Sequence, residues 1–136
     1  MKKVMVFGTF DLLHDGHINM FEQAKKYGDF LIAVIARDST VEVVKQHKTL
    51  FNEVQRLSAV KSAKNIDLAV LGSVGDKYAV IEEHRPDVIC LGYDQDSFTK
   101  LLSNELSERN LSPKIIHLEP YKADIFKSSK LKAKLL

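Results

Sequence analysis

The sequence of 136 residues contains a single cysteine, Cys90. One thiol excludes an internal disulfide and a zinc site built from several cysteines. Because Cys90 sits in the apolar run Val88–Leu91, we expect it to be a small core residue. The net charge of +2 is too small to indicate nucleic-acid binding by itself. The nucleotide-binding signature GxxxxGK[ST] of P-loop proteins is also absent.

Long apolar runs are missing as well. No stretch approaches the roughly 20 residues that a membrane span needs. Two lysines follow Met1, but Gly8, Asp11 and His14 interrupt the apolar sequence after them, so no secretory leader is expected. We therefore expect a cytoplasmic protein without membrane or nucleic-acid partners. In the absence of internal repeats and linkers, residues 1–136 are expected to form one domain.

What the chain does contain is a regular alternation of short apolar runs and helix-like stretches. We expect strands at 4–7, 30–36, 68–71, 88–91 and 115–118, and helices at 17–27, 53–63, 76–84, 96–110 and 128–136. The charged stretch 37–52 is assigned to no element. This order predicts the α/β class: a Rossmann-like three-layer fold with a five-stranded parallel sheet.

Polar and glycine-containing sequence follows three of the expected strands. Gly8-Thr9 comes after the first, Arg37-Asp38 after the second and Gly92-Tyr93-Asp94 after the fourth. Ligands of open parallel sheets bind beyond the carboxyl ends of the strands. These positions are therefore the candidate site before any motif is considered.

The run from Gly8 to His17, GTFDLLHDGH, carries the strongest chemical signal. We expect Gly8 and Gly16 to let the backbone turn where the strand ends and the helix begins. Asp15-Gly16-His17 therefore lies at a helix N-terminus, where free N–H groups and the positive dipole end attract an anion. His14 and His17, three residues apart, can converge on one target. Since no third ligand lies nearby in sequence, a phosphate is a better target than a metal ion.

This ten-residue run, placed after a strand and opening a helix, resembles the signature of the cytidylyltransferase-like nucleotidyltransferases, whose hallmark is HxGH. The resemblance extends from about Val4 to Leu131. It implies that His14 and His17 are catalytic and contact the α-phosphate of a nucleoside triphosphate. It also implies nucleotide contacts along the motif, at Gly8, Thr9, Phe10 and Gly16.

Further nucleotide contacts are implied outside the motif. The segment 52–56 resembles the family's helix start in which an arginine, here Arg56, reaches the triphosphate. Arg56 follows Glu53 by three residues, so we expect it to project from the helix start towards the strand ends. Lys45 and Lys48 lie where relatives carry phosphate-binding lysines, and Lys45 is the favoured of the two. Gly92 and Asp94 correspond to the loop that approaches ribose or base. For Asp94, as for Arg37-Asp38, an ordinary helix cap is the alternative.

The segment before the expected last helix resembles a phosphate-binding Ser/Thr-rich segment of related cytidylyltransferases. It places Ser128 and Ser129 at the phosphates, with a plain N-cap at Ser128 as the alternative. The sequence departs from the family pattern here, since Lys122 stands where the family has arginine and Ile125 where it has glycine.

The chemistry implied needs no nucleophilic serine or cysteine, because the acceptor's phosphate is itself the nucleophile. The protein aligns it with the α-phosphate and neutralises developing charge. Mg²⁺ or another divalent cation is expected to bridge the phosphates, bound mostly by their oxygens and water. Asp11 is a weak candidate for a carboxylate ligand to that ion or for a residue that orients the histidines.

The acceptor and the base remain open at this point. Size and motif resemble glycerol-3-phosphate cytidylyltransferases, which use CTP. The segments 36–38, 91–95 and 126–129 look more like archaeal FAD synthases, which adenylylate FMN with ATP, and we favour this hypothesis. A sugar-phosphate nucleotidyltransferase of the heptose type is a third possibility. A nucleotide-binding sensor without turnover is the non-enzyme alternative, and a homodimer is compatible with all four.

Overall fold

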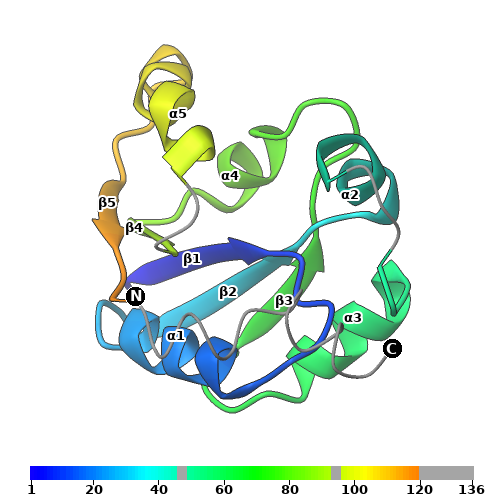
Figure 1. Ribbon diagram of the computed structural model, residues 1–136. Helices are drawn as coiled ribbons and strands as arrows, with labels where there is room; N and C mark the ends of the chain where they lie inside the picture. The colour runs from blue at the N-terminus through cyan, green and yellow to red at the C-terminus, as the bar shows by residue number, and fades with distance from the viewer. Residues whose placement is uncertain (46–48, 93–95, 120–136) are drawn as a thin grey trace.

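The computed structural model describes residues 1–45, 49–92 and 96–119. Figure 1 shows a central sheet with helices on both sides. Five strands and five helices lie in the described part of the chain: β1 Lys3–Gly8, α1 Asp15–Lys25, β2 Phe30–Ile35, α2 Asp38–Lys45, α3 Glu53–Lys61, β3 Leu68–Leu71, α4 Ala79–His84, β4 Val88–Leu91, α5 Asp96–Glu108 and β5 Lys114–His117.

The five strands form one all-parallel sheet in the order β3-β2-β1-β4-β5. The chain runs from β1 outward to β3, then returns to the other side of β1 for β4. The order therefore reverses between β1 and β4, where a sheet of this kind binds its ligand. The predicted α/β class and five-stranded parallel sheet are confirmed.

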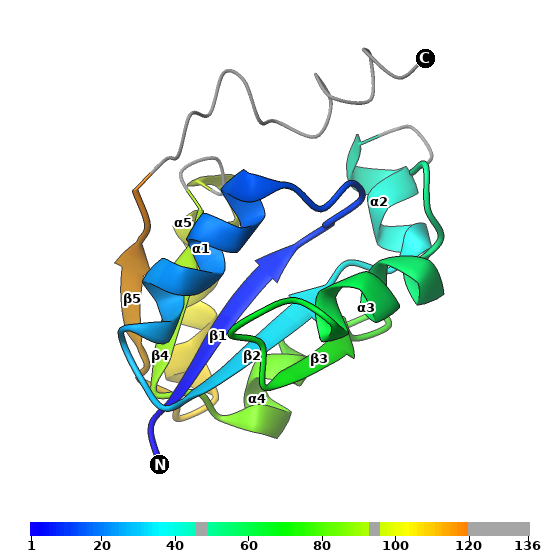
Figure 2. The ribbon, with the colours of Figure 1, turned by 90° about the horizontal axis from the view of Figure 1, so that it is seen from below.

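Each face of the sheet carries its own apolar core, because neighbouring side chains along a strand point to opposite sides. Val4 and Val6 of β1 pack with Phe21 of α1 and Val60 of α3. Met5, between them, joins the cluster that α4 and α5 cover. Figure 2, turned by 90°, shows α1 and α3 together on their face. Cys90 is fully buried, as expected, and burial raises the pKa of its thiol to about 12.

Most predicted elements differ from the structure by one or two residues at an end, and larger differences occur at α2 and α4. Helix α1 begins two residues earlier than expected, at Asp15, and α4 begins at Ala79 instead of Asp76. A short turn precedes α4, since the Asp76 carboxylate accepts the N–H of Tyr78. The stretch 37–52, which was assigned no element, contains α2. The predicted helix 128–136 lies outside the described residues.

None of the helices in residues 1–45, 49–92 and 96–119 is long and apolar enough to cross a membrane.

Candidate active site

The two motif histidines lie together at the start of α1. Their rings stack with centroids 4.0 Å apart and an angle of 27° between the planes. His14 is the N-cap of the helix, and its Nδ1 accepts the N–H of Gly16 at 3.0 Å. His17 Nδ1 accepts the N–H of His14 at 3.3 Å. Each imidazole is thus fixed to the helix N-terminus through the same ring nitrogen.

This arrangement determines the tautomer of both rings. In a neutral imidazole, the nitrogen that accepts a hydrogen bond carries no proton, so the proton of each ring is on Nε2. Burial lowers the pKa of His14 from its ordinary value of 6.5, while the charge of Asp15 acts in the opposite direction. His14 is therefore neutral at pH 7, and Nε2–H is its donor. Two Nε2–H donors side by side suit the oxygens of one phosphate.

Gly8 and Phe10 act as one packing unit behind the histidines. A Cβ atom on Gly8 would lie 2.7 Å from Phe10 Cζ, so the phenyl ring needs a glycine there. Phe10 is 3% exposed and meets the His17 ring edge-on, with centroids 5.2 Å apart. Its φ of 52° is in the left-handed region, at a cost of roughly 1–2 kcal/mol.

The expected roles of the motif glycines as turn residues are wrong. Gly8 is the last residue of β1, and what its position requires is room for the ring of Phe10. The left-handed turn falls on Phe10 itself. Gly16 is helical, the second residue of α1, and its N–H donates to His14.

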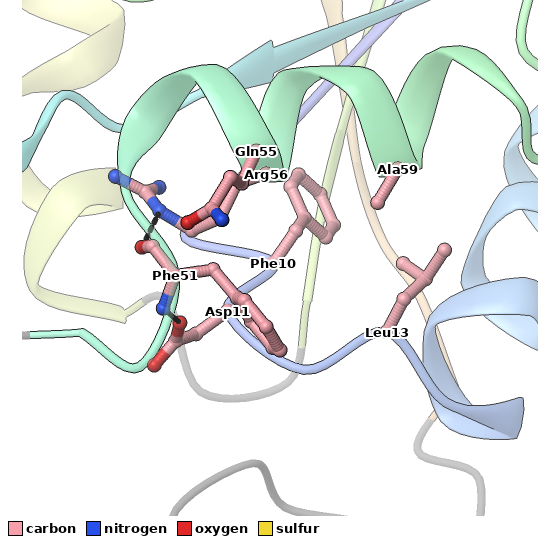
Figure 3. Close-up of a pocket in the computed structure, with 7 residues that line it drawn as sticks. All are labelled: Phe10, Asp11, Leu13, Phe51, Gln55, Arg56 and Ala59. Carbon is pink, nitrogen blue, oxygen red and sulfur yellow. Dashed lines mark hydrogen bonds between the residues drawn. The ribbon is translucent and has the colours of Figure 1, made fainter.

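Asp11 connects the motif to the segment before α3. Its Oδ2 accepts the N–H of Leu50 at 2.9 Å. Its Oδ1 accepts the N–H of Phe51, also at 2.9 Å (Figure 3). With 3% exposure, this carboxylate is buried. Both oxygens thus accept a backbone N–H, and the weak prediction that Asp11 is a metal ligand stays a prediction. Among residues 1–45, 49–92 and 96–119, no group of three or more His, Cys, Asp or Glu side chains could hold a metal ion.

Arg56 is the most deeply buried charged residue of the site, with 1% exposure. Its Nη1 donates to the carbonyl oxygens of Thr9 at 2.8 Å and Ala36 at 2.7 Å. Its Nε donates to Phe51 O at 3.1 Å, and its Nη2 pairs with Asp38 at 2.7 Å. Arg56 reaches the strand ends, as predicted, but its contacts there are to the protein. The guanidinium thus binds three carbonyls and a carboxylate of the protein, and the triphosphate contact implied by the resemblance stays a prediction.

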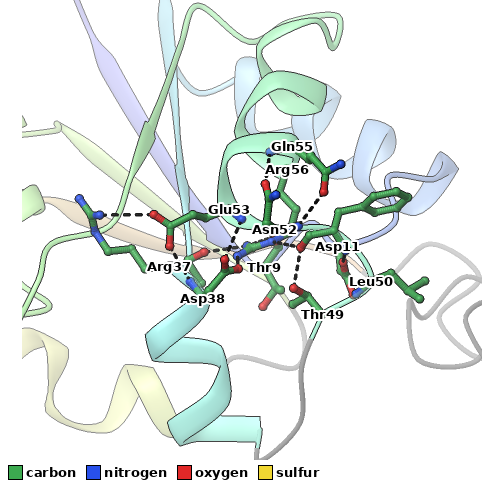
Figure 4. A network of polar contacts seen from close by, with 12 residues as sticks. Thr9, Asp11, Arg37, Asp38, Thr49, Leu50, Asn52, Glu53, Gln55 and Arg56 are labelled. Atoms are coloured by element: carbon green, nitrogen blue, oxygen red, sulfur yellow. Dashed lines mark hydrogen bonds and ion pairs between the residues drawn. The ribbon is translucent and has the colours of Figure 1, made fainter.

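Around Arg56, helices α2 and α3 cap each other. The N–H of Asp38 donates to Glu53 Oε1 at 2.9 Å, and the N–H of Glu53 donates to Asp38 Oδ2 at 3.2 Å (Figure 4). Arg37 adds an ion pair to Glu53 and a bond to Gly72 O. The hydrogen bond from Arg56 holds the pKa of Asp38 below its usual range. Of the alternatives for Arg37-Asp38, the structure supports the helix cap.

The remaining predicted residues are placed to different extents. Thr9 lies in the loop after β1, and Gly92 follows β4 across the switch point, partly buried. Lys45 is the last residue of α2, and its side chain is not described. Lys48, Asp94, Lys122, Ile125, Ser128 and Ser129 lie outside the described residues. The nucleotide contacts assigned to these positions stay predictions.

Sequence reasoning named the segment 52–56 but missed Phe51 and the place of Gln55 in the site. Phe51 and Gln55 stand opposite the motif loop, on the far side of the space that Figure 3 shows. Asn52 caps α3 by accepting the N–H of Gln55, and Gln55 Oε1 accepts the N–H of Asn52. Asn followed three residues later by Gln is a capping box, which could have been recognised in the sequence.

The chain also matches a family model. The model described as cytidylyltransferase-like covers residues 5–134. This chain belongs to the cytidylyltransferase-like family. The resemblance drawn from the HxGH run is confirmed, and with it the prediction of a nucleotidyltransferase.

Two curated relatives in this family are FAD synthases. The protein from Aciduliprofundum boonei is 46% identical over 121 residues, which are 89% of this chain and 80% of the relative. The protein from Methanohalophilus mahii is 38% identical over 137 residues and covers all of this chain and 95% of its own length. Among solved structures, a lipopolysaccharide core biosynthesis protein from Thermoplasma volcanium superposes with a TM-score of 0.85 and 38% identity, covering 90% of this chain and 99% of that one.

The buried network makes a prediction about Arg56 in this cytidylyltransferase-like chain. Arg56→Lys leaves buried carbonyls without donors, because an ammonium cannot copy the planar fork of the guanidinium. We expect the free energy of unfolding to fall by about 3 kcal/mol, the scale of leaving buried carbonyl oxygens without hydrogen-bond donors. Urea denaturation measures it. Arg37→Lys, in the same network but partly exposed, is the control and should cost less than about 1 kcal/mol. Equal effects of the two substitutions would refute this account.

A second prediction concerns pH. The folded pKa of His14 lies below its unfolded value, so the unfolded chain binds more protons below neutrality. The stability from His14 is present above about pH 6.5 and is lost as the pH falls. His14→Asn keeps an N-cap acceptor and does not titrate. Urea midpoints of the parent should therefore fall more steeply between pH 7.5 and 5 than those of the variant. Parallel curves would show that His14 is not the group responsible.

Proposed function

We propose that this protein transfers AMP from ATP to FMN, forming FAD and releasing pyrophosphate. The observation that carries the reaction class is the stacked pair His14 and His17 at the N-terminus of α1. The curated relatives support the choice of ATP and FMN as substrates. Two relatives that match this chain over 80% and 95% of their own length are FAD synthases. The segments after β2 and β4 that first favoured flavin over glycerol phosphate are consistent with this choice.

The reaction is a displacement at the α-phosphorus of ATP. An oxygen of the FMN phosphate forms a new bond to that phosphorus, and the bond from the phosphorus to the bridging oxygen of the leaving pyrophosphate breaks. No side chain has to become a nucleophile. The protein contributes alignment of the two phosphates and stabilisation of the charge that builds on the α-phosphate oxygens.

His14 and His17 are the proposed catalytic residues. Each carries a proton on Nε2, because its Nδ1 accepts a backbone N–H. We assign these two Nε2–H groups to the non-bridging oxygens of the α-phosphate. The dipole of the 11-residue helix α1 favours the same negative charge. Thr9 and Gly92 flank the switch point between β1 and β4, where we place the nucleotide.

We assign Arg56 a positioning role in place of a phosphate contact. It binds the carbonyls of Thr9 and Ala36, the first residues after β1 and β2, and so fixes the start of the loop that carries the histidines. Contacts to the departing pyrophosphate remain assigned to Lys45, Ser128 and Ser129, as the resemblance implies.

In this proposal the divalent metal ion is bound mainly by the phosphates of ATP. The described side chains do not build a metal site, and both oxygens of Asp11 accept backbone N–H groups. Mg²⁺ is therefore expected to enter already bound to the phosphates of ATP, with water completing its shell.

The first experiment follows flavin fluorescence with FMN, Mg²⁺ and either ATP or CTP. Formation of the dinucleotide quenches the isoalloxazine, so fluorescence should fall with ATP and stay constant with CTP. Chromatography of the product and release of pyrophosphate are measured in the same reaction. No change with either nucleotide would overturn the flavin acceptor. Glycerol 3-phosphate and sugar phosphates would then be tested, because the Thermoplasma volcanium relative is described as a lipopolysaccharide core biosynthesis protein.

A second prediction tests the histidine assignment. His17→Ala removes one donor to the transition state and should lower turnover by ~10²–10³, the effect of losing such a donor. Circular dichroism checks that the variant folds. His117→Ala, on exposed sequence of β5, is the matched control and should keep the parent's rate. Turnover of His17→Ala within a factor of three of the parent would remove His17 from the mechanism.

A further inference from the structure

A cavity of about 250 Å³ lies beside the motif loop. It is bounded by the loop after β1, by the segment before α3 and by one side of α3 (Figure 3). Its lining consists of Phe10, Asp11, Leu13, Phe51, Gln55, Arg56 and Ala59. Among these lining residues, only Phe10 keeps an assignment to the nucleotide, because Arg56 has been given a positioning role.

The cavity is on the side of the motif opposite the switch point where we place the nucleotide. The switch point lies between β1 and β4, and Gly92 marks its far edge. Helix α3, which walls the cavity, packs on β2 and β3 instead. A group in the cavity would therefore approach the histidines from the other flank of the β1–α1 loop. In a displacement at the α-phosphorus, that flank is where the second substrate belongs.

The cavity lies close to His17, one of the proposed catalytic residues. The ring of Phe10 forms the floor of the cavity and meets the His17 ring edge-on at 5.2 Å. Leu13, on the rim, directly precedes His14 in the chain. A molecule seated on Phe10 is thus one aromatic ring away from a catalytic imidazole.

The lining suits a flat ring with polar edges. Phe10, Phe51, Leu13 and Ala59 supply apolar surface, and aromatic side chains favour stacked or edge-on partners. Gln55 uses its amide oxygen on the N–H of Asn52, so its NH₂ group is the donor side. Carbonyl oxygens on the edge of a ring are suitable acceptors for such a group. Pockets that enclose whole drug-sized ligands begin at roughly 300 Å³, so this one takes part of a larger molecule.

We propose that this cavity binds the isoalloxazine ring of the acceptor, with Phe51 as its outer wall. The inference rests on the proposed function and adds the place of the flavin. The ribityl phosphate then extends past Leu13 toward the histidines. Asp11 supports the arrangement, because its two hydrogen bonds to the N–H groups of Leu50 and Phe51 fix the backbone of the outer wall. Phe51 itself is 40% exposed, so its ring is accessible from solvent.

A tryptophan placed at position 51 reports contact directly. The chain contains no tryptophan, and an indole in contact with isoalloxazine quenches its fluorescence. Phe51→Trp is titrated into FMN with α,β-methylene ATP, which cannot transfer AMP. Fluorescence anisotropy reports binding in the same samples. Val74→Trp, at a position that is 78% exposed in the segment before α4, is the matched control. We expect at least a twofold stronger quench at saturation for Phe51→Trp than for the control or the parent.

A second pair of variants tests the cavity by filling it. Ala59→Leu places a larger side chain in the lining, and Ser58→Leu places the same bulk beside it, on exposed surface outside the lining. We expect Ala59→Leu to raise the KM for FMN by about tenfold, within the range that one lost apolar contact produces. The KM for ATP should stay within twofold in both variants. Ser58→Leu should leave both constants unchanged.

The outcomes separate the two proposals. If the parent makes FAD but position 51 quenches no more than position 74 and Ala59→Leu leaves the KM for FMN unchanged, the cavity is not the flavin site. The proposed function would stand in that case. If the parent neither binds FMN nor makes FAD, the proposed function fails, and the flavin assignment of the cavity fails with it. Equal rises in both Michaelis constants would mean that Ala59→Leu distorts the site, which also contradicts the proposal.

Discussion

The guanidinium of Arg56 lies where the two central strands end, and three separate segments are held by it. One hydrogen bond fixes the loop after β1, a second fixes the turn after β2, and a third fixes the segment before α3. Buried carbonyls need donors, and a planar cation can serve several at once. The position of the histidines, the capping of α2 and α3, and the shape of the cavity all depend on this single charged group.

The histidine pair shows how a local hydrogen bond prepares a site for its chemistry. At many helix starts a Ser, Thr, Asp or Asn side chain accepts the first N–H groups. Here imidazole nitrogens do so, and the same bonds that cap α1 assign the proton of each ring to the other nitrogen. Helix formation and presentation of the donors are therefore one event. A side chain that only capped the helix would leave no such donors for a phosphate.

Much of the fold followed from the sequence, because strands buried on both faces are continuous apolar runs. The strands at 68–71 and 88–91 have the predicted ends, and the parallel order follows from the alternation with helices. Helix α2 was missed because its first residue is stabilised by Glu53, 15 positions away, and local sequence carries no trace of that. For the same reason Arg56 could be placed at the strand ends but not assigned to carbonyls. Whether an arginine faces a ligand or the protein depends on where the backbone oxygens of other segments lie.

Gly8 and Phe10 illustrate a constraint on how such a chain can change over time. Any side chain at position 8 would meet the phenyl ring at 2.7 Å, and the ring in turn supports His17. Neither residue can be exchanged alone without moving the imidazole of His17. A homologue with a larger residue at position 8 should therefore carry a smaller one at position 10, and the two positions should covary as a pair. The Gly-x-Phe spacing is therefore set by side-chain packing, and we expect it wherever the two histidines occur in this arrangement.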